Sequence, residues 1–214
     1  MNQIDIIMKT KWKLFIGTIA VIALSFSAAQ AQEARMGVKG GLNISNLYVD
    51  NVNDENSRIG FNAGFYGQIL STEFFAIQPE LLYTTKGSEN EYDGFVNQNV
   101  KFNLNYLELP VLAVFKLGKV AEIHAGAYGS YLLGANVSYE GDIINGGEDL
   151  DRDNFKTYDY GLVGGFGLNF GDVQIGTRYN YGLVKLAKTD NAKTILGDSK
   201  NSVAQVYVAF NLNK

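Results

Sequence analysis

The stretch YDYGLVGGFGLNFGDVQIGTRYNYGL, residues 158–183, determines the fold class. Large apolar side chains occupy every second position over most of it, in residues 158–170 and again in residues 173–183. Alternation with a period of two is typical of a β-strand with one apolar face. The two residues between these segments, Gly171 and Asp172, suit a tight turn, so the stretch predicts a β-hairpin.

The same alternation covers most of the remaining chain. It recurs in six further segments, which are residues 36–45, 58–69, 75–86, 100–115, 123–139 and 206–212. Segment 100–115 changes phase partway, with Val100 to Tyr106 on one parity and Leu107 to Phe115 on the other. A β-bulge near Tyr106 would keep both sets of apolar side chains on one face.

The connections between these eight segments alternate in length. Short ones are expected around residues 71–72, 118–119 and 171–172, and long polar ones at residues 50–57, 87–99, 140–155 and 187–201. This pattern predicts an all-β fold, an eight-stranded antiparallel up-and-down transmembrane β-barrel with short periplasmic turns and long extracellular loops.

A soluble barrel is the main alternative, and in it the apolar residues would point inward around a ligand. Two features favour the membrane barrel. Many glycines share the polar parity with charged residues, which suits a narrow lumen, and tyrosine and phenylalanine lie near strand ends, where aromatic girdles form.

Composition excludes several other classes. The chain has 214 residues and no cysteine, which excludes disulfides and thiol nucleophiles. Its net charge of -4 lacks the positive surplus that nucleic-acid binding requires. Its mean hydropathy of -0.06 is too low for a bundle of membrane helices.

The first 31 residues predict a cleaved signal peptide. Lys9, Lys11 and Lys13 precede an apolar run at residues 14–24, and a small-residue tail ends at Ala31. The run is shorter than the roughly 20 apolar residues that a spanning helix needs. Residues 32–214 then form a single barrel domain, whether translation starts at Met1 or at Met8.

Five stretches together are similar to a known family. They are GVKGGLN at 37–43, IQPELLYTTKG at 77–87, NYLELP at 105–110, AGAYGSYLL at 125–133 and GTRYNYGL at 176–183. These stretches resemble the PorT-like, or "porin family", outer-membrane β-barrel domain of Bacteroidota. The resemblance implies a location in the bacterial outer membrane and brings no shared catalytic residues.

The inward parity places Lys39, Glu80, Glu108 and Arg178 inside the barrel, and we assign these four charged residues to one cluster. Counted from the short turns, Glu80, Glu108 and Arg178 lie at comparable depth. Two carboxylates on neighbouring strands repel each other unless a cation lies between them, and the Arg178 guanidinium can provide one. We expect a structural charge cluster that plugs the lumen, with a gate or a proton-linked site as the alternative.

The sequence shows no catalytic or metal-binding constellation. His124 and Ser130 are six residues apart along one strand, about 20 Å, which is too far for nucleophile activation. Asp149, Asp151 and Asp153 resemble the start of a calcium loop, but its later glycine and glutamate are replaced by Asn154 and Tyr160.

The expected function is a structural or surface-interaction scaffold, with a narrow passive channel for ions or small solutes as the alternative. The long loops carry 14 acidic and 4 basic residues, which indicates a solvated acidic rim, with loose binding of divalent ions that bridge to lipopolysaccharide as the alternative. We expect no enzyme activity, no cofactor and no metal. The expected partners are outer-membrane lipid and lipopolysaccharide, together with the barrel-assembly machinery; the ligand of the loops is unknown.

We predict that the mature chain begins at Gln32 and is recovered from the outer membrane as a heat-modifiable barrel. Closed barrels resist detergent and change their gel mobility only when boiled. Fractionation, N-terminal sequencing and gels of unheated and boiled extracts measure this. Recovery in the soluble periplasmic fraction, with no mobility change on heating, would contradict the prediction.

Overall fold

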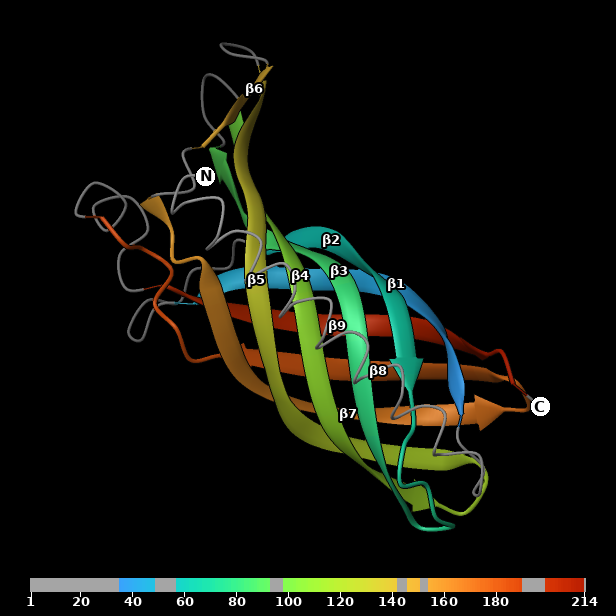
Figure 1. Ribbon diagram of the computed structural model, residues 1–214. Coiled ribbons are helices and arrows are strands. Elements are labelled where there is room, and N and C mark those ends of the chain that lie inside the picture. Colours follow the sequence, from blue (N-terminus) through green and yellow to red (C-terminus); the bar gives the residue numbers. More distant parts are fainter. Residues whose placement is uncertain are drawn as a thin grey trace, which may run out of the picture.

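The computed structural model describes residues 35–48, 57–92, 98–141, 146–150, 154–189 and 199–213. Nine antiparallel strands lie within these residues (Figure 1). They are β1 (Met36–Tyr48), β2 (Arg58–Gly67), β3 (Phe75–Tyr92), β4 (Gln98–Leu117), β5 (Ala121–Gly141), β6 (Gly146–Asp149), β7 (Tyr158–Phe170), β8 (Val173–Gly182) and β9 (Lys200–Asn211). No helix in the described part of the chain has the length and apolar character needed to cross a membrane.

Eight of the strands close into a barrel. The hydrogen-bonded order is β4, β3, β2, β1, β9, β8, β7, β5, and pairing of β4 with β5 completes the ring. The first and last strands pair over their lengths, from Gly37 opposite Asn211 to Tyr48 opposite Lys200. The predicted eight-stranded antiparallel barrel is therefore confirmed, and closure leaves no strand edge within the ring.

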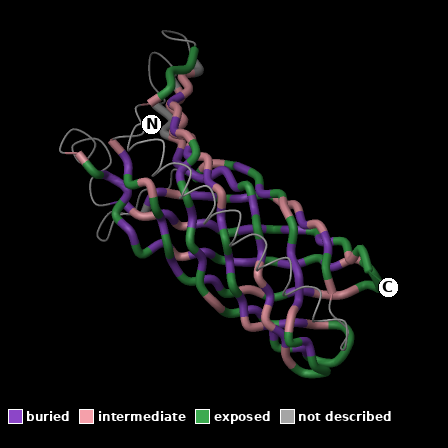
Figure 2. Tube along the Cα trace, viewed as in Figure 1, coloured by how far each residue is buried: buried purple, intermediate pink, exposed green. Residues whose placement is uncertain are grey.

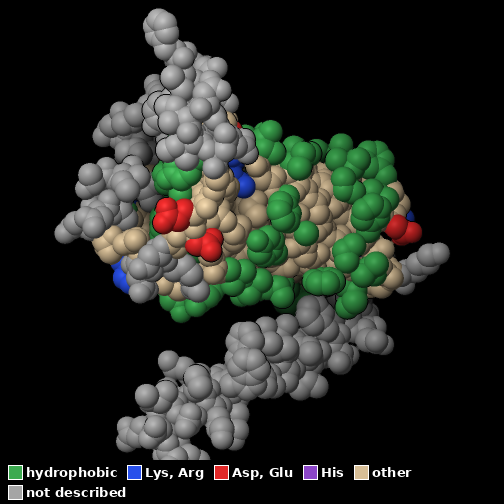
Figure 3. Space-filling model, turned by 90° about the horizontal axis from the view of Figure 1, so that it is seen from above, with side chains coloured by type: hydrophobic (Ala, Val, Ile, Leu, Met, Phe, Trp, Pro, Cys, Tyr) green, Lys and Arg blue, Asp and Glu red, His purple; other side chains and the backbone are tan. Residues whose placement is uncertain are grey.

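The two faces of the wall differ in polarity, as the alternation predicts. Leu42 is 60% exposed, whereas the next residue, Asn43, is fully buried in the lumen. Figure 2 shows the same change from buried to exposed at successive positions along the strands. On the side seen in Figure 3, hydrophobic side chains cover much of the outer wall.

The turns at one end are short. Gly171 and Asp172 alone connect β7 to β8, and residues 118–120 connect β4 to β5. The connection from β2 to β3 is longer than expected, with seven residues between the strands, and a bridge between Ile69 and Ile77 narrows it. The short side of the alternating pattern is thus observed in the structure.

Strands extend into regions that the sequence analysis assigned to loops. β3 continues to Tyr92 and β4 starts at Gln98, so much of the expected loop at residues 87–99 is sheet. The short strand β6 pairs only with β5, and together these strands project beyond the barrel (Figure 1). The pattern missed this sheet because turn-forming Gly87 and the polar residues after it do not alternate.

The predicted facing is wrong beside the register shift between β4 and β5. Leu104 and Tyr106 point into the lumen, 2% and 1% exposed, instead of outward. The register does shift at Asn105 and Tyr106, but the extra residue is Leu133 on the partner strand β5. The same parity of β4 therefore faces the lumen throughout the strand. The apolar residues after Tyr106, such as Leu109, line the outer wall, whereas Leu104 and Tyr106 fill the lumen.

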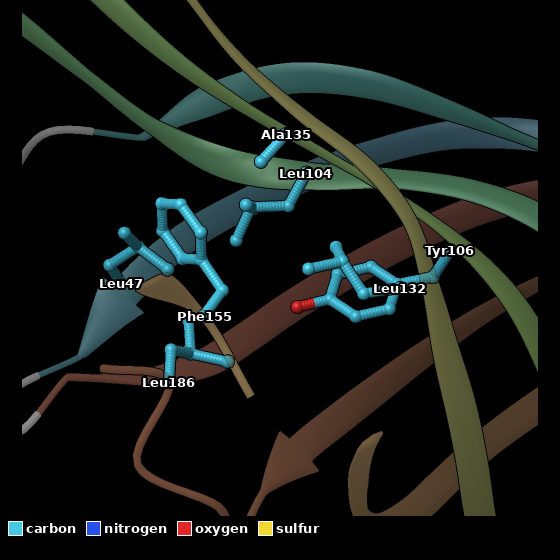
Figure 4. Close-up of a cluster of buried hydrophobic side chains, with 7 residues drawn as sticks. All are labelled: Leu47, Leu104, Tyr106, Leu132, Ala135, Phe155 and Leu186. Carbon is cyan, nitrogen blue, oxygen red and sulfur yellow. The ribbon is translucent and has the colours of Figure 1, made fainter. Parts of the chain in front are cut away.

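These inward apolar residues build a cluster that we call the apolar cap (Figure 4). Its members are Leu47, Leu104, Tyr106, Leu132, Ala135, Phe155 and Leu186. Phe155 and Leu186 lie outside the strands, in segments held by a bridge between Phe155 and Ala187. The cap occupies the end of the lumen away from the short turns.

The predicted signal peptide at residues 1–31 lies outside the described residues, as do Asp151 and Asp153. Asp149 lies in β6 and is exposed.

We predict that a charge on the outer wall destabilises the barrel in proportion to its depth. Leu109 is 54% exposed in the middle of the barrel part of β4, whereas Val120 is 59% exposed in a short turn. Leu109→Arg should lower the free energy of unfolding in lipid by about 2 to 4 kcal/mol, and Val120→Arg by about 0 to 1 kcal/mol. Denaturant titration in vesicles measures both; equal effects would mean that the wall does not face hydrocarbon.

Candidate functional site

An ion pair spans the full width of the barrel lumen. The Arg178 guanidinium on β8 donates two hydrogen bonds to the Glu80 carboxylate on β3, at 2.7 and 2.9 Å. Four strand positions separate β3 from β8 in either direction around the ring, so these strands are diametrically opposite. Both side chains are fully buried. A bidentate guanidinium–carboxylate pair is among the strongest polar contacts in proteins.

Two further residues complete what we call the lower charge layer, Lys39, Glu80, Arg178 and Tyr207. Lys39 Nζ lies 3.5 Å from Glu80 Oε2 and 3.5 Å from the centre of the Tyr207 ring. Arg178 Cζ lies 5.2 Å from the same centre. One carboxylate and one aromatic face therefore hold two cations.

Gly176 makes the space that the Tyr207 ring occupies. A Cβ atom at Gly176 would overlap the Tyr207 hydroxyl oxygen. The glycine faces the lumen on β8 beside Tyr207 on β9. Lys39 from β1 contacts the face of the same ring. The absence of a side chain at Gly176 on β8 therefore helps to position the ring that binds Lys39.

A second set of ion pairs lies nearer the apolar cap, and we call Lys86, Glu108 and Asp159 the upper charge layer. Lys86 Nζ lies 2.6 Å from Glu108 Oε2 and 3.5 Å from Asp159 Oδ2. Ser130 and Asn180 each donate a hydrogen bond to Glu108, at 3.1 and 3.0 Å. Every member of the layer is at most 1% exposed.

Three of the four residues expected in one cluster are brought together. Lys39, Glu80 and Arg178 are in contact, whereas Glu108 binds Lys86 instead of sharing the Arg178 guanidinium. Arg178 therefore does not separate two carboxylates. Glu108 does not need Arg178 because Lys86 supplies its cation. Lys86 lies further along β3 than Glu80 and is also buried in the lumen. Two separate charge layers replace the single expected cluster.

A polar network surrounds Glu122 near the short turns. Glu122 accepts hydrogen bonds from Asn169 at 3.1 Å and from Gln174 at 2.9 Å, and its Oε1 lies 3.4 Å from Arg35 Nη1. His124 Nε2 lies 3.3 Å from Glu122 Oε2. This network connects to the lower charge layer, because the hydroxyl group of the layer's tyrosine donates to Gln174 Oε1 at 3.2 Å.

His124 and Ser130 do not form a nucleophile and base pair. Ser130 donates its hydroxyl hydrogen to Glu108, whereas His124 contacts Glu122 and Tyr207. Within the described residues, no group of three or more His, Cys, Asp or Glu side chains is placed to hold a metal ion.

The two charge layers together hold equal numbers of opposite charges. Their cations are Lys39, Lys86 and Arg178, and their carboxylates are Glu80, Glu108 and Asp159. Buried charges are stable only when paired, and here each lies close to an opposite charge in the lumen. The apolar cap lies beyond the upper charge layer, on the side away from the short turns. The cap and the two layers together occupy the lumen, and some of their contacts join strands on opposite sides of the ring.

Sequence reasoning did not assign Lys86, Asp159 and Glu122 to the charged site. A signal was available for each, because all three lie on the inward parity of their strands. Asp159 is hard to recognise from the sequence because it lies between two aromatic residues, Tyr158 and Tyr160. Lys86 is hard to recognise because it adjoins the expected loop at residues 87–99.

A closed barrel with an apolar outer wall and a filled polar lumen has the design of an outer-membrane β-barrel. The chain belongs to the family described as "Outer membrane protein beta-barrel domain", whose model matches residues 28–188. Its location is accordingly the bacterial outer membrane. Comparison with curated proteins gives no match.

The solved structures that match this chain include the following two. Ail, the attachment invasion locus protein of Yersinia pestis, solved in complex with the heparin analogue sucrose octasulfate, is 14% identical, with a TM-score of 0.49 over 85% of this chain and 100% of Ail. Neisserial surface protein A is 13% identical, with a TM-score of 0.46 over 85% of this chain and 98% of the other.

We predict that Glu80→Gln destabilises the barrel more than Arg178→Gln does. Glu80→Gln leaves two buried cations without a carboxylate and should lower the free energy of unfolding by about 3 to 5 kcal/mol. Arg178→Gln leaves Lys39 paired with Glu80, so its effect should be smaller. Denaturant titration of both variants in the same vesicles measures the difference, and the reverse order would contradict the charge assignment.

Proposed function

We propose that this protein is a structural or surface-interaction scaffold of the outer membrane, with a lumen closed by its own side chains. The observation that carries the proposal is the Glu80–Arg178 pair, which joins opposite strands across the barrel. Eight strands enclose a space only wide enough for side chains. A contact across its full width leaves the lumen obstructed at that level.

The apolar cap supports the same conclusion at a second level. Its seven members are at most 9% exposed, and they come from strands and from segments outside the strands. Water and ions avoid an apolar constriction, because no polar group replaces their hydration. A solute would have to displace both the cap and the ion pairs.

The sheet that projects beyond the barrel supports a role at the cell surface. β6 is exposed at all four of its positions, and it extends the sheet of β3, β4 and β5 away from the wall. Figure 1 shows this projection at the end of the barrel opposite the end of β9. We propose that lipopolysaccharide and outer-membrane lipid surround the protein and that the barrel-assembly machinery inserts it.

We also propose that the protein belongs to a narrower group within this family. The five stretches that resemble the PorT-like, or porin-family, domain of Bacteroidota support membership of that group, and the word porin implies no conductance here.

We predict that the wild-type protein shows only small or rare openings in planar bilayers. Arg178→Ala removes the contact across the lumen and should raise the frequency of openings, whereas Leu109→Ala on the outer wall should leave it unchanged. Single-channel recording of the three proteins measures this. A large, stable wild-type conductance that is unaffected by Arg178→Ala would instead establish the narrow passive channel.

A further inference from the structure

The lower charge layer carries more positive charge than its own members neutralise. Lys39 and Arg178 share one carboxylate, Glu80, and all three side chains are at most 1% exposed. The upper charge layer has the opposite imbalance, since Lys86 faces both Glu108 and Asp159. The surplus positive charge therefore lies on the side of the short turns.

Both cations also have hydrogen atoms without an acceptor. Lys39 Nζ has no hydrogen-bond partner, although it forms an ion pair with Glu80 Oε2 at 3.5 Å, and Arg178 Nε is likewise without a hydrogen-bond partner. Buried donors in proteins are nearly always satisfied, and the ion pair with Glu80 and the Tyr207 ring face leave the hydrogen-bonding capacity of Lys39 partly unused. Two such donors lie in one layer, and both of their side chains border the same Tyr207 ring.

We propose that the lower charge layer binds a small monovalent anion of the halide class beside Lys39 and Arg178. A halide ion accepts hydrogen bonds from several donors and would neutralise the surplus charge. Both cations border the Tyr207 ring, so the site is walled by an aromatic face and by the Glu80 carboxylate, which is already engaged by Arg178. Water is the competing occupant, since it satisfies donors without adding charge.

The first test is the dependence of stability on chloride. A ligand that binds only the folded state raises the unfolding midpoint, by about 3 to 5 °C for each tenfold rise in chloride above its dissociation constant. Midpoints are read from gel mobility after heating, in sodium chloride and in sodium gluconate of equal ionic strength. Wild type should show the chloride-specific rise.

Two lysine variants make the test specific. Lys39→Met removes the ammonium group and should abolish the chloride-specific rise. Lys116→Met is the matched control, because Lys116 Nζ donates to Ser71 and Thr72 at the level of the short turns, at 2.6 and 3.0 Å. Its chloride response should equal that of wild type. The same response in all three proteins would overturn the proposal.

A second measurement needs no variant. Crystals of the wild-type protein grown in bromide should show an anomalous peak beside Lys39 Nζ. Absence of that peak, together with no chloride-specific rise in the midpoint, would mean that water fills the site and would overturn the inference. A stable conductance in bilayers would reject the scaffold function without bearing on anion binding, so the two proposals fail separately.

Discussion

The width of the lumen is the constraint on which the rest of the structure depends. Eight strands leave room for side chains alone, so whatever points inward must fit and must find its partners inside. Glu80 and Arg178 meet this requirement by reaching across the barrel, where a bidentate pair satisfies both charged groups. Charges that lined an open pore would instead be solvated and need no such geometry.

The period-two alternation was sufficient to predict the barrel, its strand count and the polarity of most of the wall. It failed at Leu104 and Tyr106, because an apolar side chain suits both a lipid-facing wall and an apolar cap. Parity alone does not distinguish these environments. The register shift was placed near the correct residues, but the sequence contains no indication that β5 rather than β4 holds the extra residue.

The charged site was less predictable than the fold, since pairing depends on how far strands are staggered around the ring. Lys86 and Glu108 meet because β3 and β4 are neighbours, with Lys86 long enough to span the offset between them. Asp159 then joins from β7, three strand positions away from β3. Contacts across a barrel require both the stagger and the side-chain length, and only the second can be read from sequence.

The order of the layers along the barrel has its own physical consequence. Ion pairs strengthen where water is excluded, and the apolar cap excludes it from the side of the long connections. Tyr106 belongs to the cap and also lies near Lys86, whose Nζ is 5.2 Å from its ring centre. The cap and the upper charge layer are therefore one packed unit, in which apolar contacts protect the electrostatic contacts that hold opposite sides of the barrel together.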